Sequence, residues 1–305
     1  MKNIREIGRK IYNVNYWRER RRYYIFLLRC FFNKSKMKKI DDFFHSTKLL
    51  EEIADIYPFV YEQPTRAFFY NKSTFDERTA LVEKHMDFTA RTFRADIVRD
   101  LYSEKNISLW DGGELDGSRL WGMLYFEAGQ RKEGMMSVML RLDKKPLYQM
   151  IFWIAPDKKG DMSMFIGAMQ GPNMDNARDV VKKVTKHCHA YRTKNLILYL
   201  TQAVARSLGM KHIYAVTNYG YYANNHVRAD RKLKTDFSEF WTEAGGHPTD
   251  DTRFDELPLV ETRKTMEEVP TRKRAVYRKR FAMLDALDAE VAEKMKELMV
   301  SEAAR

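Results

Sequence analysis

The sequence predicts an α/β protein of the α+β kind, in which helices precede and follow a mixed sheet. Between Ile40 and Asn106, apolar residues recur at three- and four-residue steps, which is the spacing of buried helix faces. From about Ser108 the apolar residues instead form short runs separated by turn residues, which is typical of strands. With 305 residues, 44% of them hydrophobic, the chain is long enough and apolar enough to bury a core.

The first 40 residues carry almost all of the net charge. They contain 13 Lys and Arg residues against Glu6 and Glu19, whereas the other 265 residues contain 41 basic and 40 acidic groups. Apolar residues of this segment fall at helical spacing: Ile4, Ile7, Ile11 and Val14. Aromatic residues suited to a membrane interface follow them: Trp17, Tyr23, Tyr24 and Phe26. Residues 1–40 are therefore predicted to form a basic, aromatic, amphipathic arm.

Two interpretations of the arm remain open. An anionic membrane surface would attract it, at about 1 kcal/mol per well-placed cation, or its helix could dock on the rest of the chain with the basic face in water. The longest apolar stretch, from Tyr23 to Phe32, contains Arg29 and is too short to span a bilayer as a helix. We therefore predict that the protein does not cross a membrane. Nucleic acid is not an expected partner, because the rest of the chain has no excess of positive charge.

Residues 41–107 are predicted to form a helical region. Pro58 and Pro64 interrupt its periodicity. A helix is expected to begin after Thr74, because Glu77 lies three residues later and gives the spacing of a capping box.

Four successive strands are predicted to form an antiparallel meander, because short turn sequences join them. Their ranges are Arg119–Ala128, Gly134–Leu142, Leu147–Pro156 and Met162–Gly171. The sequence Asp111–Gly113, which precedes them, is expected to be a turn.

A long helical stretch follows the meander, from Asn176 to Leu208, with a break expected near Tyr191. The strand Lys211–Asn218 comes next, and a strand, a helix and a strand in this order predict a parallel pair. The remaining expected elements are a short helix at Asp236–Gly246, a last strand at Leu257–Thr265 and a charged helix from Arg272 to about Met299. The predicted α/β core thus covers residues 108–270, and the C-terminal helix covers residues 271–305.

The order of these elements resembles the acetyltransferase-like fold called GNAT. In that fold a strand end and the following helix hold the pyrophosphate of coenzyme A, and "AMQGPNMDNARD" stands at the corresponding place. The resemblance implies coenzyme A or an acyl-CoA as cofactor. The residues expected to bind it are Gln170, Gly171, Asn173, Arg192, Lys194 and Asn218. A plain strand-to-helix turn remains the alternative, because Pro172, Asp175 and Asp179 disfavour an ordinary phosphate cradle.

The polar loop after the strand Lys211–Asn218 is the expected place for catalytic groups, since ligand sites favour the carboxyl ends of parallel strands. Tyr221, Tyr222 and His226 could act there as general acid or base, with Glu239 from the next helix. A loop that merely covers the sheet edge is the alternative. No metal site is predicted, because His187 and His189 lie two residues apart and would point to different sides of a helix.

Several stretches of the sequence resemble the bacterial VirK/YbjX family. They are "RKEGMMSVMLRL", "FIGAMQGP", "AYRTKNLILYLTQAVARSLGMKHIYAVTN", "FWTEAGG" and "RKRAVYRKRFAMLDAL". The resemblance implies a factor of the Gram-negative cell envelope with a role in virulence and in antimicrobial peptide resistance. It brings no catalytic residues that could be carried over.

Two functions are expected from the sequence and the resemblance together. In the first, the protein is an acyltransferase that moves an acyl group from a thioester donor to an envelope lipid or glycan precursor. In the second, it is a non-catalytic binding or regulatory factor on the same fold. Either would be cytoplasmic and peripheral on the inner membrane.

The two cysteines, Cys30 and Cys188, agree with a reducing compartment, because they show neither a disulfide framework nor metal-ligand spacing.

Overall fold

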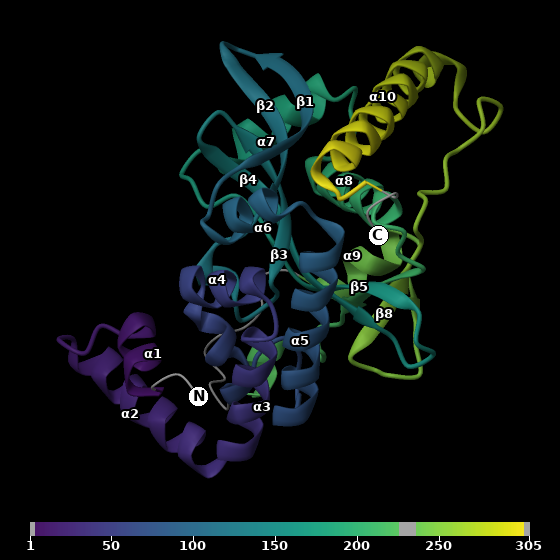
Figure 1. Cartoon of the computed structure of the whole chain (residues 1–305). Helices are drawn as coiled ribbons and strands as arrows, with labels where there is room; N and C mark the ends of the chain where they lie inside the picture. The colour runs from purple at the N-terminus through teal and green to yellow at the C-terminus, as the bar shows by residue number, and fades with distance from the viewer. Residues whose placement is uncertain (1–3, 226–235, 302–305) are drawn as a thin grey trace.

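An eight-stranded sheet forms the centre of the protein, and helices cover both of its faces (Figure 1). The structure is a computed structural model that describes residues 4–225 and 236–301. The strand order is β1-β2-β3-β4-β5-β6-β8-β7. The strands are β1 (Ile107–Leu115), β2 (Ser118–Tyr125), β3 (Met136–Leu142), β4 (Lys145–Pro156), β5 (Met162–Gln170), β6 (His212–Val216), β7 (His247–Pro248) and β8 (Phe254–Leu257). The α+β fold class is thereby confirmed.

The predicted meander is confirmed as β2 to β5, in which each strand pairs antiparallel with the next. The predicted parallel pair is also confirmed, since β5 and β6 run parallel from Ser163 opposite His212 to Ile166 opposite Ala215. Turn residues and apolar runs were sufficient to predict these strands, because both signals are contained within a few residues of sequence.

Two strand predictions were wrong. Asp111–Gly113 is not a turn but lies within β1, at a shift in the register with β2. Gly113 has a φ of +80°, which glycine adopts without strain, so the irregular backbone stays inside the strand. The last strand is not Leu257–Thr265 but β8, which ends at Leu257 because Pro258 has no N–H to continue the ladder.

The helices are α1 (Ile4–Ile11), α2 (Trp17–Phe32), α3 (Lys34–Phe44), α4 (Lys48–Ile56), α5 (Phe75–Thr92), α6 (Ala95–Tyr102), α7 (Ala177–His187), α8 (Thr193–Ser207), α9 (Phe237–Glu243) and α10 (Arg274–Leu298). The helix α5 begins with the predicted capping box of Thr74 and Glu77. α8 packs on β3 and β4, with α10 against α8 and β1. α5 packs on the opposite face of β4, where His85 accepts a hydrogen bond from the Ile154 N–H at 3.0 Å.

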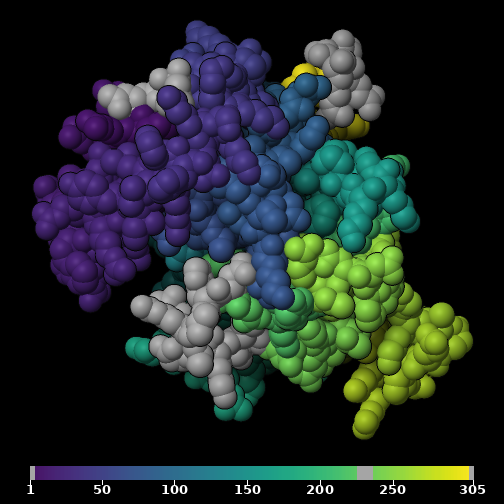
Figure 2. Space-filling view, turned by 90° about the horizontal axis from the view of Figure 1, so that it is seen from below, coloured from purple at the N-terminus to yellow at the C-terminus, as the bar shows by residue number. Residues whose placement is uncertain are grey.

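The N-terminal helix α1 docks on the rest of the chain. Ile7 and Ile11 are buried, and Gly8 allows close packing on α2, since a Cβ there would lie 2.7 Å from the ring of Tyr23. Tyr12, just after α1, donates a hydrogen bond to the buried carboxylate of Glu62 at 2.5 Å. The docking interpretation therefore holds for α1. The N-terminal helices form a lobe on one side of the molecule (Figure 2).

Within the described ranges, no helix combines the length and the apolar character that crossing a membrane would require.

Candidate functional site

A segment from another part of the chain occupies the place where β5 and β6 part. The two strands pair only as far as Ile166 and Ala215. Beyond that point the backbone of Glu133 lies against Gly167, where an added Cβ would be 1.8 Å from the Glu133 carbonyl oxygen. Only glycine fits at position 167 in this backbone arrangement. The segment 130–134 therefore lies against the face of β5 at Gly167.

The side chain of Glu133 joins three parts of the chain at this place. Tyr221 donates a hydrogen bond to one carboxylate oxygen at 2.6 Å, and Gln170 Nε2 donates to the other at 2.7 Å. Glu133 is buried. Burial raises the pKa of Glu133, although the hydrogen bonds from Tyr221 and Gln170 act in the opposite direction. Burial and the neighbouring Glu133 carboxylate also raise the pKa of Tyr221.

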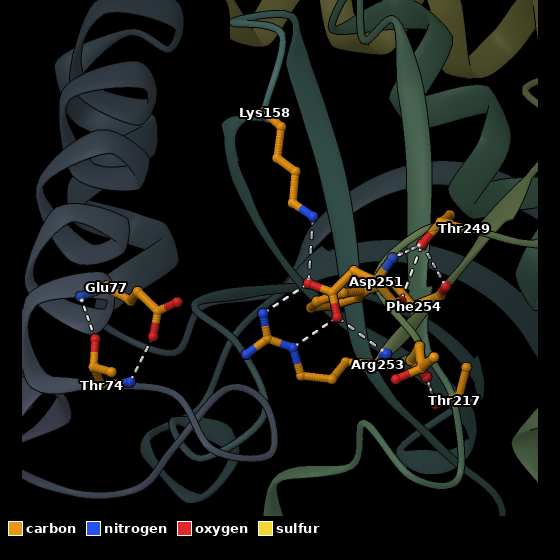
Figure 3. A network of polar contacts seen from close by, with 9 residues as sticks. Thr74, Glu77, Lys158, Thr217, Thr249, Asp251, Arg253 and Phe254 are labelled. Atoms are coloured by element: carbon orange, nitrogen blue, oxygen red, sulfur yellow. Dashed lines mark hydrogen bonds and ion pairs between the residues drawn. The ribbon is translucent and has the colours of Figure 1, made fainter.

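The loop that carries Tyr221 is fixed by the turn before β8. The N–H of Thr217 donates to the carbonyl oxygen of Arg253 at 2.9 Å. Gly220 lies against the same carbonyl, since a Cβ there would be 1.9 Å from it. The Arg253 guanidinium is itself held by Asp251, which Lys158 also approaches (Figure 3). The position of Tyr221 is thus set by the backbone of 217–220 packing on this turn.

A second buried carboxylate lies on the other side of the segment 130–134. Glu62 accepts hydrogen bonds from Tyr12, from Arg66 at 3.2 Å and from Arg131 Nε at 2.6 Å. Because Arg131 and Glu133 are two residues apart, the same short segment contacts Glu62 through one residue and β5 through the other.

Of the four expected catalytic residues, Tyr221 and Tyr222 lie in ring contact, with centroids 4.9 Å apart. Tyr221 belongs to the Glu133 cluster, and Tyr222 is buried against Phe68. Glu239 is exposed on α9, where its N–H donates to the Asp236 cap. His226 lies outside the described residues.

Four of the six expected cofactor residues have polar partners within the protein. Gln170 donates to Glu133, while Gly171 and Asn173 are exposed. Arg192 and Lys194 both form ion pairs with Glu243, at 3.3 and 3.2 Å. Asn218 caps α9, because its side chain accepts from the Phe237 N–H and donates to Asp236. Gln170, Arg192, Lys194 and Asn218 are thus bonded within the protein, and the binding of coenzyme A at this place stays a prediction.

One set of side chains in the described part of the chain has the spacing of a metal site: Asp157, Asp161 and His212, whose ligand atoms lie within 4.8 Å of one another. Asp157 accepts from the N–H groups of Lys159 and Asp161 and from the Tyr214 hydroxyl, and this network accounts for its place in the β4–β5 turn. His187, which was not expected to bind metal, hydrogen-bonds the Gly112 carbonyl at 2.7 Å.

Sequence reasoning missed Glu133, which is the centre of the cluster. It lies in a turn 37 residues before Gln170 and 88 residues before Tyr221, so no local pattern connects the three. One signal was present in the sequence. Gly167 stands inside an otherwise apolar strand, and a glycine in that position often marks the close approach of another backbone.

Comparison with curated proteins finds relatives that are similar over about a third to a half of this chain. A Haemophilus influenzae protein named only as uncharacterized is 30% identical over 157 residues, which is 52% of each chain. The uncharacterized protein YbjX of Escherichia coli is 31% identical over 164 residues, 53% of this chain and 49% of that one. A Mannheimia haemolytica protein named membrane protein LapB is 29% identical over 97 residues, 32% of this chain and 41% of its own length. The chain thus spans about half the length, or less, of these relatives.

No solved structure matches the chain. The family model described as "Protein of unknown function (DUF535)" matches residues 15–293, which is most of the chain. Together with the similarity to YbjX, this match confirms the predicted family: the chain belongs to the DUF535 family, the VirK/YbjX proteins.

Proposed function

We propose that this protein is a binding or regulatory factor of the bacterial cell envelope, which works at the cytoplasmic face of the inner membrane without transferring an acyl group. The observation that carries the proposal is the contact of Glu133 with β5 at Gly167 and Gln170. The Glu133 backbone lies against Gly167, and Gln170 is bonded to the Glu133 side chain. A cofactor at the place that the GNAT resemblance implies would have to displace these contacts.

The location at the envelope is supported by the relatives. One of them carries the name membrane protein LapB, and the VirK/YbjX family is associated with the Gram-negative envelope. The proposed role includes the antimicrobial peptide resistance and the virulence that the family resemblance implies. The basic, aromatic arm adds a physical reason for contact with anionic lipid.

A thermal-shift experiment with coenzyme A and with palmitoyl-CoA tests the non-catalytic proposal. A ligand that binds only the folded state stabilises it by about 2.7 kcal/mol at one hundred times its Kd. We expect no rise in melting temperature at ligand concentrations up to about 1 mM, where even a weak cofactor site would be filled. A reproducible rise with coenzyme A, which has no acyl chain, would overturn the proposal.

Acyl transfer to an envelope lipid or glycan precursor is the second candidate function, and the Glu133–Tyr221 pair favours it. A carboxyl group with a raised pKa beside a tyrosine hydroxyl is a suitable proton acceptor and donor. If palmitoyl-CoA stabilised the wild type, the variant Glu133→Gln would decide the role of this pair. If this variant lost acyl-CoA turnover but bound palmitoyl-CoA as the wild type does, the Glu133–Tyr221 pair would be assigned to catalysis.

A further inference from the structure

The helix α2 is apolar on two opposite faces. Its inner face packs on the chain through Tyr23, Phe26 and Cys30, which are buried. Its outer face carries a second set of large side chains, which we name the α2 stripe: Trp17, Tyr24, Leu28, Phe31 and Phe32. The exposed fractions of these five residues range from 57% to 78%. A surface helix with one buried face is expected to be polar on the other, so the outer face needs a separate explanation.

The stripe is continuous along the helix. At 3.6 residues per turn, its five residues fall within about 100° of the helix circumference. The rings of Phe31 and Phe32 also contact each other, with centroids 5.6 Å apart. Six of the ten large hydrophobic residues that are exposed in the described ranges lie between Tyr16 and Phe32. Single exposed apolar residues are normal, but a contiguous set marks an interaction surface.

Arginines surround the stripe. Arg21 lies within it on the helical wheel, and Arg18 and Arg20 lie at its two borders. Together with Arg22 these side chains are exposed, and none of the four forms an ion pair with another residue in the described parts of the chain. The one acidic residue of α2, Glu19, accepts a hydrogen bond from the Asn13 N–H at 2.7 Å. The outer face of α2 is therefore both apolar and strongly positive.

This combination points to one partner. We propose that the α2 stripe is a docking surface for an anionic lipid bilayer, with α2 lying in the plane of the headgroups. Aromatic and Leu side chains would enter the boundary of the acyl chains, and the arginines would meet lipid phosphates. A second copy of the chain is a poorer fit, because a two-fold axis through the stripe would place arginines against arginines. In Figure 1, α1 and α2 lie at one end of the molecule and α10 lies at the other.

The inference rests on the proposed location at the membrane and is independent of the question of catalysis. It also differs from the sequence interpretation in its residues. Of the aromatic residues expected at a membrane interface, Tyr23 and Phe26 are buried, whereas Trp17 and Tyr24 are exposed. The isoleucines Ile7 and Ile11 of α1 are buried and cannot contact lipid in this structure.

Sedimentation of the full chain with vesicles tests the proposal. One set of vesicles contains equal amounts of phosphatidylglycerol and phosphatidylethanolamine, and the other contains phosphatidylcholine alone. We expect preferential binding to the anionic vesicles. The double substitution Phe31→Ser and Phe32→Ser should weaken this binding at least about 10-fold, because each ring loses the burial of its apolar surface. Arg20→Gln with Arg21→Gln should weaken it about 10-fold to 30-fold at low salt.

Val260→Ser is the matched control, since Val260 is as exposed as the stripe residues but lies outside α2. It should bind vesicles like the wild type. All three variants should keep the wild-type melting temperature, because the substituted side chains are on the surface.

Each other outcome overturns a defined part of the proposal. If the Phe31 and Phe32 variant pellets as well as the wild type, the stripe is not the docking surface, although the membrane location stands. If the wild type does not bind anionic vesicles, both the stripe and the location are wrong, whatever coenzyme A does. If the wild type fails to bind and size-exclusion chromatography shows a dimer that the stripe variant abolishes, the partner is a second copy.

Discussion

Replacing Gly167 with alanine tests whether the segment 130–134 is as firmly placed against β5 as the structure indicates. The added Cβ would lie 1.8 Å from the Glu133 carbonyl oxygen and 2.9 Å from the ring of Trp153. The first obstacle is backbone, so it cannot be relieved by a change of rotamer. Either β5 or the segment around Glu133 must move.

The cost follows from what that movement breaks. Forcing an additional carbon into a packed site typically costs about 1–3 kcal/mol. A shift of Glu133 would also weaken its hydrogen bonds with Tyr221 and Gln170, and hydrogen bonds to a charged group contribute about 1.5–3 kcal/mol each. Because the movement relieves the clash at the expense of these bonds, we expect a loss of about 3–5 kcal/mol in the free energy of unfolding.

Gly171→Ala is the matched control, four residues further along the same stretch. A Cβ at that position would meet Tyr148 at an ordinary 3.5 Å, so a change within about 0.5 kcal/mol is expected. Urea unfolding followed by circular dichroism measures both variants. Equal stabilities of the two alanine variants would refute the reasoning, and so would a loss below about 1 kcal/mol for Gly167→Ala.

Three further predictions concern buried or capping groups. Burial lowers the pKa of His85 to about 3, below its ordinary value, so the folded state resists protonation. The stability that the folded state gains from keeping His85 neutral is fully present above about pH 6.5. It is lost as the pH falls towards 3, and the free energy of unfolding is lower by about 2 kcal/mol at pH 5. Urea unfolding at pH 7 and pH 5 measures this loss, which a His85→Gln variant should not share; the same pH dependence in both proteins would contradict the assignment. Thr74→Ala should destabilise the protein by about 1 kcal/mol, because it removes the acceptor for the Glu77 N–H. In thermal or urea unfolding, Thr74→Ser should keep most of the stability that Thr74→Ala loses, because serine also has a hydroxyl acceptor. Equal destabilisation by Ala and Ser would argue against the cap. Tyr12→Phe removes a donor from the buried Glu62 carboxylate and should cost about 1.5–3 kcal/mol in urea unfolding. Tyr16→Phe on the surface should be neutral, and a neutral Tyr12→Phe would show that this contact is not important for stability.

Much of the fold could be predicted because its signals are local. The ends of β4 and β5 were close to the predicted ones, since each strand is an apolar run bounded by turn residues. The same holds for α5, whose start depends on Thr74 and Glu77 alone. The wrong prediction of a turn at Asp111–Gly113 has a different cause. Whether Asp111–Gly113 forms a turn or continues as a strand depends on its pairing with β2. The three residues alone do not predict that pairing.

The candidate site was harder to predict, because its members come from distant parts of the chain. Tyr221 and Gln170 were named from the sequence for separate reasons, as a proton shuttle and as part of a phosphate cradle. The structure places both on the same carboxylate. Arg192 and Lys194 were expected to meet an anion, and they do, but the anion is Glu243 of α9. The type of a residue indicates which kind of interaction it can form, whereas tertiary packing decides its partner.

The segment 130–134 also contributes to how the α2 stripe is held relative to the sheet. Arg131 donates to Glu62, which accepts from Tyr12 at the end of α1. α1 in turn packs closely on α2 at Gly8. A continuous path of contacts therefore connects α2 with β5, and α2 is not tethered by a flexible linker. Binding of the stripe to a bilayer would consequently fix the orientation of the whole sheet, and with it the face on which any envelope component would meet the loop of Tyr221.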